Sequence, residues 1–356
     1  MRVRRSGRVL GSFVALALVA AACSGDDDDS ADDASGEGEG SGEVTEVTAV
    51  LPFPSGINFY PFFVGEANDY YAEEGLSMTT EVADGSGQAL ARVLDGSAEM
   101  CLCSPGPVLE AIGNEDAPVE LVYTLYQSDV FALVAPDGST IDSVESLQGQ
   151  TIGVGAIDGG ETAWLTSLLA AQGLEQDTDY TLLAVGEGGQ AISAFEGEDI
   201  AAYASAFPDI AIMRLRDFDV NAIDLPGADN FFDALIVMNS EWIEENPELV
   251  EGIGRATAKA TVWGFDHDSE VLDITGEEYP EELEDRDFAL ALLDETQALF
   301  ELPDSAGGRW GYSVPERVDF LVDYLIDQGA APEGVDPAVF NNDFVTAYNE
   351  FDPDDL

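Results

Sequence analysis

From Val44 onward, short apolar segments alternate with longer segments in which apolar residues recur every three or four positions. The short segments predict β-strands at Val47–Leu51, Leu76–Val82 and Glu99–Cys103. The longer segments predict amphipathic helices between them, the first of which ends before Gly75. Because alternation of strands and helices is typical of layered α/β domains, the pattern predicts an α/β fold.

The same arrangement returns later in the chain. Strand candidates at Leu182–Val185 and Ile200–Ala204 lie on either side of a helix that begins with Gly-Gly-Gln-Ala. In the first copy, the helix after Leu76–Val82 begins with the similar sequence Gly-Ser-Gly-Gln-Ala. In both copies a serine, Ser104 or Ser205, follows the helix-ending glycine by eight residues. This internal similarity predicts two α/β lobes.

A further strand candidate, Thr151–Val154, leads into Asp158–Thr162, another glycine-containing start of a helix. Open α/β sheets bind ligands where strand ends and helix N-termini meet. Two facing lobes therefore predict a ligand cleft between them.

The first 43 residues differ from the rest in composition. Residues 1–22 are basic and then apolar, which is typical of an export signal and too short for a comfortable membrane span. The end of this segment at Cys23 resembles a bacterial lipobox, in which the cysteine is lipidated; an ordinary signal peptide with an incidental cysteine is the alternative. Residues 23–43 are mostly Ser, Gly, Asp and Glu, which predicts a disordered acidic leash. We expect a lipid anchor at the extracytoplasmic face of the membrane.

The chain carries 72 acidic side chains against 12 Lys+Arg, for a formal net charge of -60. Four of the arginines fall in the first eight residues, so the body is more acidic still. Nucleic-acid binding needs a basic patch, and this balance excludes it. The sequence leaves open whether the acidity reflects a saline medium or a solvated exported surface.

Few side chains suited to catalysis or metal binding are present. His267 is the only histidine, so a Ser-His-Asp triad would have to include it. Lys259 is the only lysine and follows Ala258 rather than Gly, which excludes a Walker A loop. With three cysteines, a zinc site of His and Cys lacks ligands. We expect no metal, no cofactor and no catalytic residue.

Cys101 and Cys103 lie two residues apart on one predicted strand. Extended geometry keeps their Cβ atoms well beyond the ~4 Å that a disulfide needs. We therefore expect two buried, unbonded side chains.

Several segments, in order, resemble the SsuA/THI5-like (NMT1/THI5-type) substrate-binding proteins of ABC importers. They include Tyr-Tyr-Ala-Glu-Glu-Gly-Leu at 70–76, Gly-Ser-Gly-Gln at 85–88, and Leu-Gln-Gly-Gln-Thr-Ile-Gly-Val at 147–154. Segments 245–258 and 316–344 extend the resemblance over nearly all of the chain after residue 43.

The resemblance implies a type II periplasmic-binding-protein fold. Lobe 1 would span residues 44–129 and lobe 2 residues 130–240, with C-terminal helices at 241–356 packing back on lobe 1. Two hinge strands would cross between the lobes near Ser128–Val134 and Ala234–Asn239.

Residues at the loops that face the implied cleft are the candidates for ligand binding. Aromatic rings there can stack on a planar ligand, and polar groups can orient it. Asp209 can receive an amine or cap a helix. The expected ligand-binding residues are Phe53, Asn58, Tyr60, Gly85, Ser86, Gln88, Ser104, Tyr126, Gln127, Gly160, Glu161, Thr162, Ser205 and Asp209, with Phe59, Trp164, Tyr203 and Phe207 as further aromatic candidates.

The resemblance implies a monomeric extracytoplasmic solute-binding lipoprotein that delivers a small nutrient to ABC permease and ATPase subunits. Family ligands are anions (alkyl sulfonates, taurine, nitrate) or heterocycles (thiamine pyrimidine precursors, riboflavin). Because no cation is expected in a cleft loop, a heterocycle is favoured, although helix N-termini leave anions open. An enzyme of the THI5-like fold and an adhesive surface lipoprotein are the alternatives, and the His- and Cys-bearing motif of THI5-type pyrimidine synthases is absent.

Overall fold

A computed structural model describes residues 44–157 and 159–356. The expected export signal, the lipidation site Cys23 and the acidic leash lie outside the described residues. Among the residues that are described, no helix is long and apolar enough to cross a membrane.

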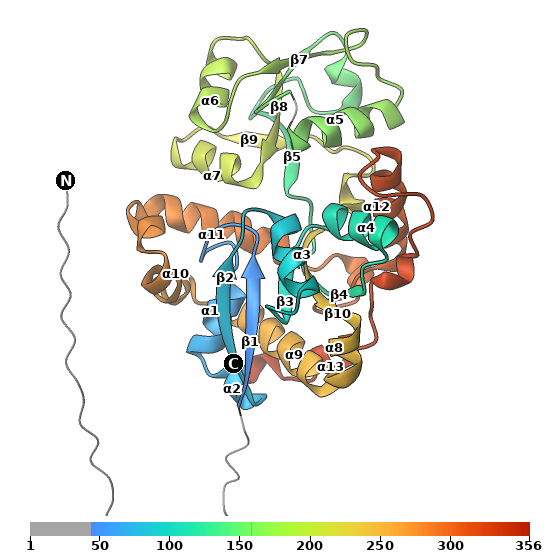
Figure 1. Ribbon diagram of the computed structural model, residues 1–356. Coiled ribbons are helices and arrows are strands. Elements are labelled where there is room, and N and C mark those ends of the chain that lie inside the picture. The colour runs from blue at the N-terminus through green and yellow to red at the C-terminus, as the bar shows by residue number, and fades with distance from the viewer. Residues whose placement is uncertain (1–43, 158) are drawn as a thin grey trace, which may run out of the picture. The chain divides into compact units, whose positions relative to one another are not determined.

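The first lobe is built on a five-stranded mixed sheet with the order β2-β1-β3-β10-β4 (Figure 1). β1 (Thr45–Leu51) pairs in parallel with β2 (Leu76–Val82) and β3 (Met100–Cys103). β10 (Asp233–Asn239) pairs antiparallel with both β3 and β4 (Val119–Tyr126). The apolar residues of β3 and β10 are buried, as expected for strands at the centre of a covered sheet.

The second lobe has its own five-stranded sheet, with the order β7-β6-β8-β5-β9. β6 (Thr151–Val154) pairs in parallel with β7 (Thr181–Ala184) and β8 (Ala202–Ala206). β5 (Phe131–Pro136) pairs antiparallel with β8 and β9 (Val220–Ala222). Two separate mixed sheets with helices confirm the prediction of a two-lobed α/β fold.

Helices cover the sheets and form the C-terminal part of the chain. The predicted helix before Gly75 is broken in two, because Asp69 adopts a left-handed conformation with φ 61°. The helices are α1 (Tyr60–Ala67), α2 (Tyr70–Glu73), α3 (Ser86–Leu94), α4 (Pro105–Glu115), α5 (Gly160–Ala171), α6 (Gly189–Glu196), α7 (Phe207–Leu215), α8 (Ser240–Glu245), α9 (Pro247–Gly264), α10 (Asp268–Glu278), α11 (Arg286–Phe300), α12 (Pro315–Asp327) and α13 (Val345–Tyr348).

The chain crosses between the lobes twice. The first crossing, residues 127–130, joins β4 to β5, close to where a hinge was expected. The second crossing is residues 223–232, between β9 and β10, and not Ala234–Asn239 as predicted. This corrects the hinge position and the end of lobe 2: Ala234–Asn239 is apolar because it is an inner strand of the first sheet, paired on both sides.

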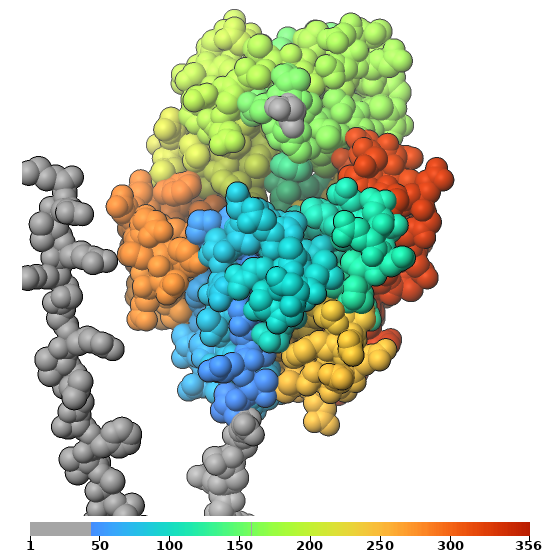
Figure 2. Space-filling view, viewed as in Figure 1, coloured from blue at the N-terminus to red at the C-terminus, as the bar shows by residue number. Residues whose placement is uncertain are grey.

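The C-terminal helices do not all pack on the first lobe alone. α9 packs on α1 and α2, whereas α11 also contacts α7 of the second lobe (Figure 2). Arg214 of α7 pairs with Asp294 of α11 at 2.6 Å. At the end of α12, the Gln328 amide donates a hydrogen bond to the Ser167 hydroxyl of α5 at 2.8 Å. The lobes are therefore connected by helix contacts as well as by the two crossings.

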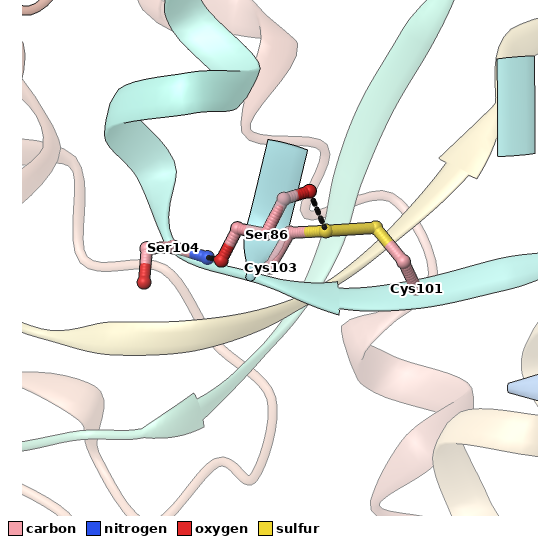
Figure 3. Close-up of a disulfide and its surroundings, with 4 residues drawn as sticks. All are labelled: Ser86, Cys101, Cys103 and Ser104. Atoms are coloured by element: carbon pink, nitrogen blue, oxygen red, sulfur yellow. Dashed lines mark hydrogen bonds between the residues drawn. A yellow bond between two sulfur atoms is a disulfide. The ribbon is translucent and has the colours of Figure 1, made fainter. Parts of the chain in front are cut away.

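Cys101 and Cys103 form a disulfide, so the prediction of unbonded cysteines is wrong (Figure 3). Their Cα atoms are 5.7 Å apart. Two residues of extended strand would separate them by about 6.6 Å, so the strand is contracted here and the side chains meet. The prediction that both side chains are buried is confirmed.

Candidate functional site

A cavity of about 250 Å³, called here the aromatic cavity, lies between the two lobes. The first lobe contributes the loop after β1 and the ends of β3, β4 and β10, and the second lobe contributes the start of α7. The lining residues are Pro52, Phe53, Phe59, Leu102, Cys103, Ser104, Tyr126, Val130, Ala206, Phe207, Pro208, Asp233 and Ala234.

Four aromatic rings wall this cavity. Phe53 and Phe59 lie with their ring centroids 4.9 Å apart, and Phe59 stacks with Tyr126 at 6.5 Å. Tyr126 meets Phe207 of the second lobe edge-on at 6.4 Å. The Tyr126 hydroxyl donates to the main-chain carbonyl of Asn58 at 3.0 Å, which fixes its ring. Rings from both lobes thus form an apolar surface that suits a planar ligand.

The polar groups of the aromatic cavity are Ser104 and Asp233. Ser104 precedes α4, and its main-chain N–H donates to the Ser86 hydroxyl at 3.0 Å (Figure 3). Burial raises the pKa of Asp233, and the hydrogen bond from the Ala234 N–H and then the nearby Ser104 hydroxyl oppose the rise. A carboxyl in this position is able to accept a hydrogen bond from an N–H or O–H group inside the cavity.

A second cavity of about 300 Å³, called here the hinge cavity, adjoins the first. The two share Ser104, Val130 and Asp233. The hinge cavity lies between the start of α4, both crossings, the start of α5 and α12. Its lining residues are Ser104, Pro105, Gly106, Pro107, Asp129, Val130, Phe131, Gly160, Ala163, Trp164, Phe231, Phe232, Asp233, Leu321, Tyr324, Leu325, Gln328 and Ala330.

Asp129 and Trp164 bring polar atoms to the hinge cavity. Asp129 Oδ1 accepts a hydrogen bond from the Phe131 N–H at 3.0 Å. Asp129 Oδ2 and the Trp164 indole N–H are buried and have no hydrogen-bond partner among the described residues. Burial raises the pKa of Asp129 to about 7. The Phe131 N–H and then the Trp164 N–H oppose this rise, although the indole does not reach hydrogen-bond geometry.

Four of the expected ligand-binding residues line these cavities. Phe53, Ser104 and Tyr126 line the aromatic cavity, and Gly160 lines the hinge cavity. Asn58 lies beside them, and its main-chain carbonyl accepts a hydrogen bond from the Tyr126 hydroxyl.

Three others are held inside the protein by hydrogen bonds to main-chain carbonyls and line neither cavity. The Tyr60 hydroxyl donates to a carbonyl of α9 at 2.8 Å. The Gln127 amide donates to a carbonyl of β4 at 3.0 Å. Ser205 is fully buried, and its hydroxyl donates to the carbonyl of the next residue at 2.9 Å.

Three expected residues of the second lobe also make internal contacts. Glu161 accepts from the N–H of Ala156, and the Thr162 hydroxyl donates to the carbonyl of the same residue. Asp209 accepts from the N–H of Gly188, which precedes α6, at 2.7 Å. These side chains order the helix starts and do not line either cavity.

The last three lie at the start of α3. Gly85 has φ 89°, a conformation that favours glycine. Ser86 supports the main chain of Ser104, whereas Gln88 is exposed. None of them lines either cavity.

The sequence interpretation missed Asp129 in the first crossing, Asp233 at the start of β10, and the residues of α12. Each aspartate stands next to large apolar residues, in Asp-Val-Phe and Phe-Phe-Asp. A charged residue inside an apolar, β-prone segment is a signal that could have identified them.

Comparison with known proteins gives a family match over most of the folded part. A family model described as "NMT1/THI5 like" matches residues 56–271. The riboflavin-binding protein RibY of Chloroflexus aurantiacus is 25% identical over 306 residues, which are 85% of this chain and 86% of that protein. The formylaminopyrimidine-binding protein of Halalkalibacterium halodurans is 21% identical over 225 residues, 62% of this chain and 67% of that protein.

Solved structures share the fold at low sequence identity. The periplasmic aliphatic sulphonate binding protein SsuA of Escherichia coli superposes with a TM-score of 0.60 and 12% identity, over 82% of this chain and 96% of that chain. The desulfurization enzyme DszB superposes with a TM-score of 0.52 and 15% identity, over 85% of this chain and 98% of that chain. The likeness shows a periplasmic-binding-protein fold, which both binding proteins and enzymes use.

Proposed function

The chain belongs to the NMT1/THI5-like family, and we propose on that premise that it is the extracytoplasmic solute-binding protein of an ABC importer. Its curated relatives are binding proteins, not enzymes. Cavities between two lobes that are joined by two crossings suit a receptor that closes on its ligand by a hinge motion. The closed, monomeric receptor then delivers the ligand to the permease and ATPase subunits.

The proposed ligand is a planar heterocycle with N–H donors, of the kind that riboflavin and aminopyrimidines represent. One observation carries this proposal: aromatic rings from both lobes wall the aromatic cavity, and its acidic group is Asp233. No Lys, Arg or His lines the aromatic or the hinge cavity. A sulfonate or nitrate ion would therefore meet a carboxyl group and no cation among the residues that line these cavities.

The start of α4, which lines the hinge cavity, is a poor anion site. α4 begins Pro105-Gly106-Pro107, and proline has no main-chain N–H. Two of the N–H groups that a helix N-terminus normally offers to an anion are thus missing. This supports a neutral ring over the anionic alternative.

The test is a calorimetric titration of the purified protein with riboflavin, an aminopyrimidine, taurine, ethanesulfonate and nitrate. We expect saturable binding of a ring compound, recovered chemically unchanged. Asp233→Asn should weaken it by about 10-fold or more, because hydrogen bonds to charged groups contribute about 1.5–3 kcal/mol. The exposed Asp142→Asn is the control for loss of one negative charge. Binding of sulfonates alone would contradict the proposal, and turnover of the ring compound would favour an enzyme.

Anchoring through Cys23 is proposed separately. The basic and apolar segment before it matches a lipoprotein signal, and an acylated cysteine would hold the protein at the membrane. We expect a labelled fatty acid to be incorporated into the wild-type chain and not into Cys23→Ser. Equal labelling of both would show that this cysteine is not the anchor.

A further inference from the structure

The hinge cavity contains buried polar atoms that the protein leaves unpaired. Trp164 is 2% exposed, and its indole N–H has no hydrogen-bond partner in the described part of the chain. Asp129 Oδ2 is also buried and has no hydrogen-bond partner among the described residues. Buried polar groups are nearly always paired with protein, water or ligand, because an unpaired one costs free energy. The two groups lie near each other without reaching hydrogen-bond geometry. Since both residues line a space of about 300 Å³, a group that bridges them has room inside it.

The hinge cavity is continuous in its lining with the aromatic cavity. Ser104, Val130 and Asp233 line both, so the two spaces meet at the crossings. Neither cavity alone exceeds the lower end of the ~300–1,000 Å³ range of small-molecule sites, whereas the two together lie inside it. The shared lining places the two cavities side by side, which is the arrangement that one ligand spanning both requires.

The chemistry of the unpaired atoms restricts what can enter. The indole N–H is a donor only, and the carboxyl of Asp129 in its ionised form is an acceptor only. A group that pairs with both must accept one hydrogen bond and donate another, as a hydroxyl or an amide does. A methyl group does neither, and a sulfonate has no hydrogen to donate and would lie near the carboxyls of Asp129 and Asp233.

We propose that the hinge cavity receives a hydroxyl- or amide-bearing arm of the ligand whose ring occupies the aromatic cavity, an inference that rests on the proposed function. The substrate class is then a heterocycle with a polar side arm rather than a bare ring. Trp164 and Asp129 determine specificity for the arm, and the aromatic cavity determines specificity for the ring.

Two flavins that differ only in the arm provide the test. Riboflavin carries a polyhydroxyl arm on its ring, and lumiflavin carries a methyl group in the same place. We expect the wild-type protein to bind riboflavin about 10-fold or more tightly than lumiflavin, measured by quenching of flavin fluorescence. Trp164→Phe, which removes the N–H and keeps an aromatic ring, should weaken riboflavin binding about 3- to 10-fold and leave lumiflavin binding unchanged.

Matched variants separate this effect from general damage. Trp242→Phe, in α8 and outside both cavities, should change neither affinity. If Trp164→Phe does not fold, Asp129→Asn supplies the same comparison, because its amide oxygen can still accept from the Phe131 N–H.

The outcomes distinguish the arm proposal from the proposed function. Equal binding of riboflavin and lumiflavin, with neither affinity changed in the variants, would overturn the arm proposal: water would then fill the hinge cavity, and heterocycle binding would stand. If neither flavin nor an aminopyrimidine binds, the proposed ligand class fails and the arm proposal fails with it. A large preference for riboflavin over lumiflavin that is lost in Trp164→Phe supports both the arm proposal and the proposed function.

Discussion

Replacing Asp129 by asparagine is expected to stabilise the ligand-free protein at pH 8, and to do so less as the pH falls to 5. The carboxyl is buried at the first crossing, and burial raises its pKa to about 7 from an ordinary value of 3.8. Asp233 raises the pKa further and Arg317 lowers it. Asparagine keeps nearly the same shape and carries no charge, so the variant loses the cost of ionising this group in the folded protein.

The sign and size follow from proton binding. Between pH 3.8 and 7 the folded protein binds a proton at Asp129 that the unfolded chain has released, so the free energy of unfolding of the wild type falls as the pH rises. One pKa unit corresponds to about 1.4 kcal/mol, so the whole shift is worth about 4 kcal/mol. Of this, about 2–3 kcal/mol develops between pH 5 and pH 8. The difference in free energy of unfolding between Asp129→Asn and the wild type should therefore grow by about 2–3 kcal/mol from pH 5 to pH 8.

Urea unfolding followed by circular dichroism at pH 5, 6, 7 and 8 measures this difference. Urea is uncharged and does not screen the acidic surface as guanidinium would. The exposed Asp142→Asn variant controls for loss of one charge from a protein of net charge -60. If the two stability curves of wild type and Asp129→Asn run parallel across this pH range, the carboxyl is already ionised or solvated, and the reasoning about its burial is refuted.

Three further outcomes are expected. Phe207→Ala removes the aromatic wall that the second lobe contributes, and should weaken binding of the ring compound about 10-fold in a calorimetric titration; an unchanged affinity would contradict the placement of the ring. Arg255→Ala breaks two hydrogen bonds of 2.8 Å to Glu74, and should lower the free energy of unfolding by about 2 kcal/mol while ligand affinity stays constant. Reducing the disulfide between Cys101 and Cys103 should lower the free energy of unfolding by no more than about 2 kcal/mol, because the loop it closes is so short. Urea unfolding with and without a phosphine reductant measures this, and a larger loss would show that the bond holds the site in place.

Local patterns in the sequence were enough for the elements and the two-lobed layout. The predicted strands Leu76–Val82 and Thr151–Val154 coincide with β2 and β6. Strands and helices have different periods of apolar residues, and glycines stop the helices, so this information lies within short segments. For the same reason Phe53 and Phe59, before α1, and Ser104, before α4, could be named as candidates.

Tertiary structure decided which candidates line the two cavities. Gln127 and Ser205 have the same chemistry as residues that line ligand sites, but each has a main-chain carbonyl within reach and uses its hydrogen bond there. Ser104 lies at a similar strand end and faces both cavities. A polar side chain becomes available to a ligand only when the fold leaves it without an internal partner, and that depends on residues far away in the sequence.

The hinge cavity is the clearest case of what only the fold determines. Asp129 and Trp164 meet at its wall from the first crossing and α5, and Asp233 reaches it from the start of β10. No short segment contains all three, and the second crossing itself was misplaced because an inner strand and a hinge strand are equally apolar in sequence. The periodicity of apolar residues indicates how deeply a segment is buried. The order of strands in the sheet determines which other segments it packs against, and the cavity depends on that order.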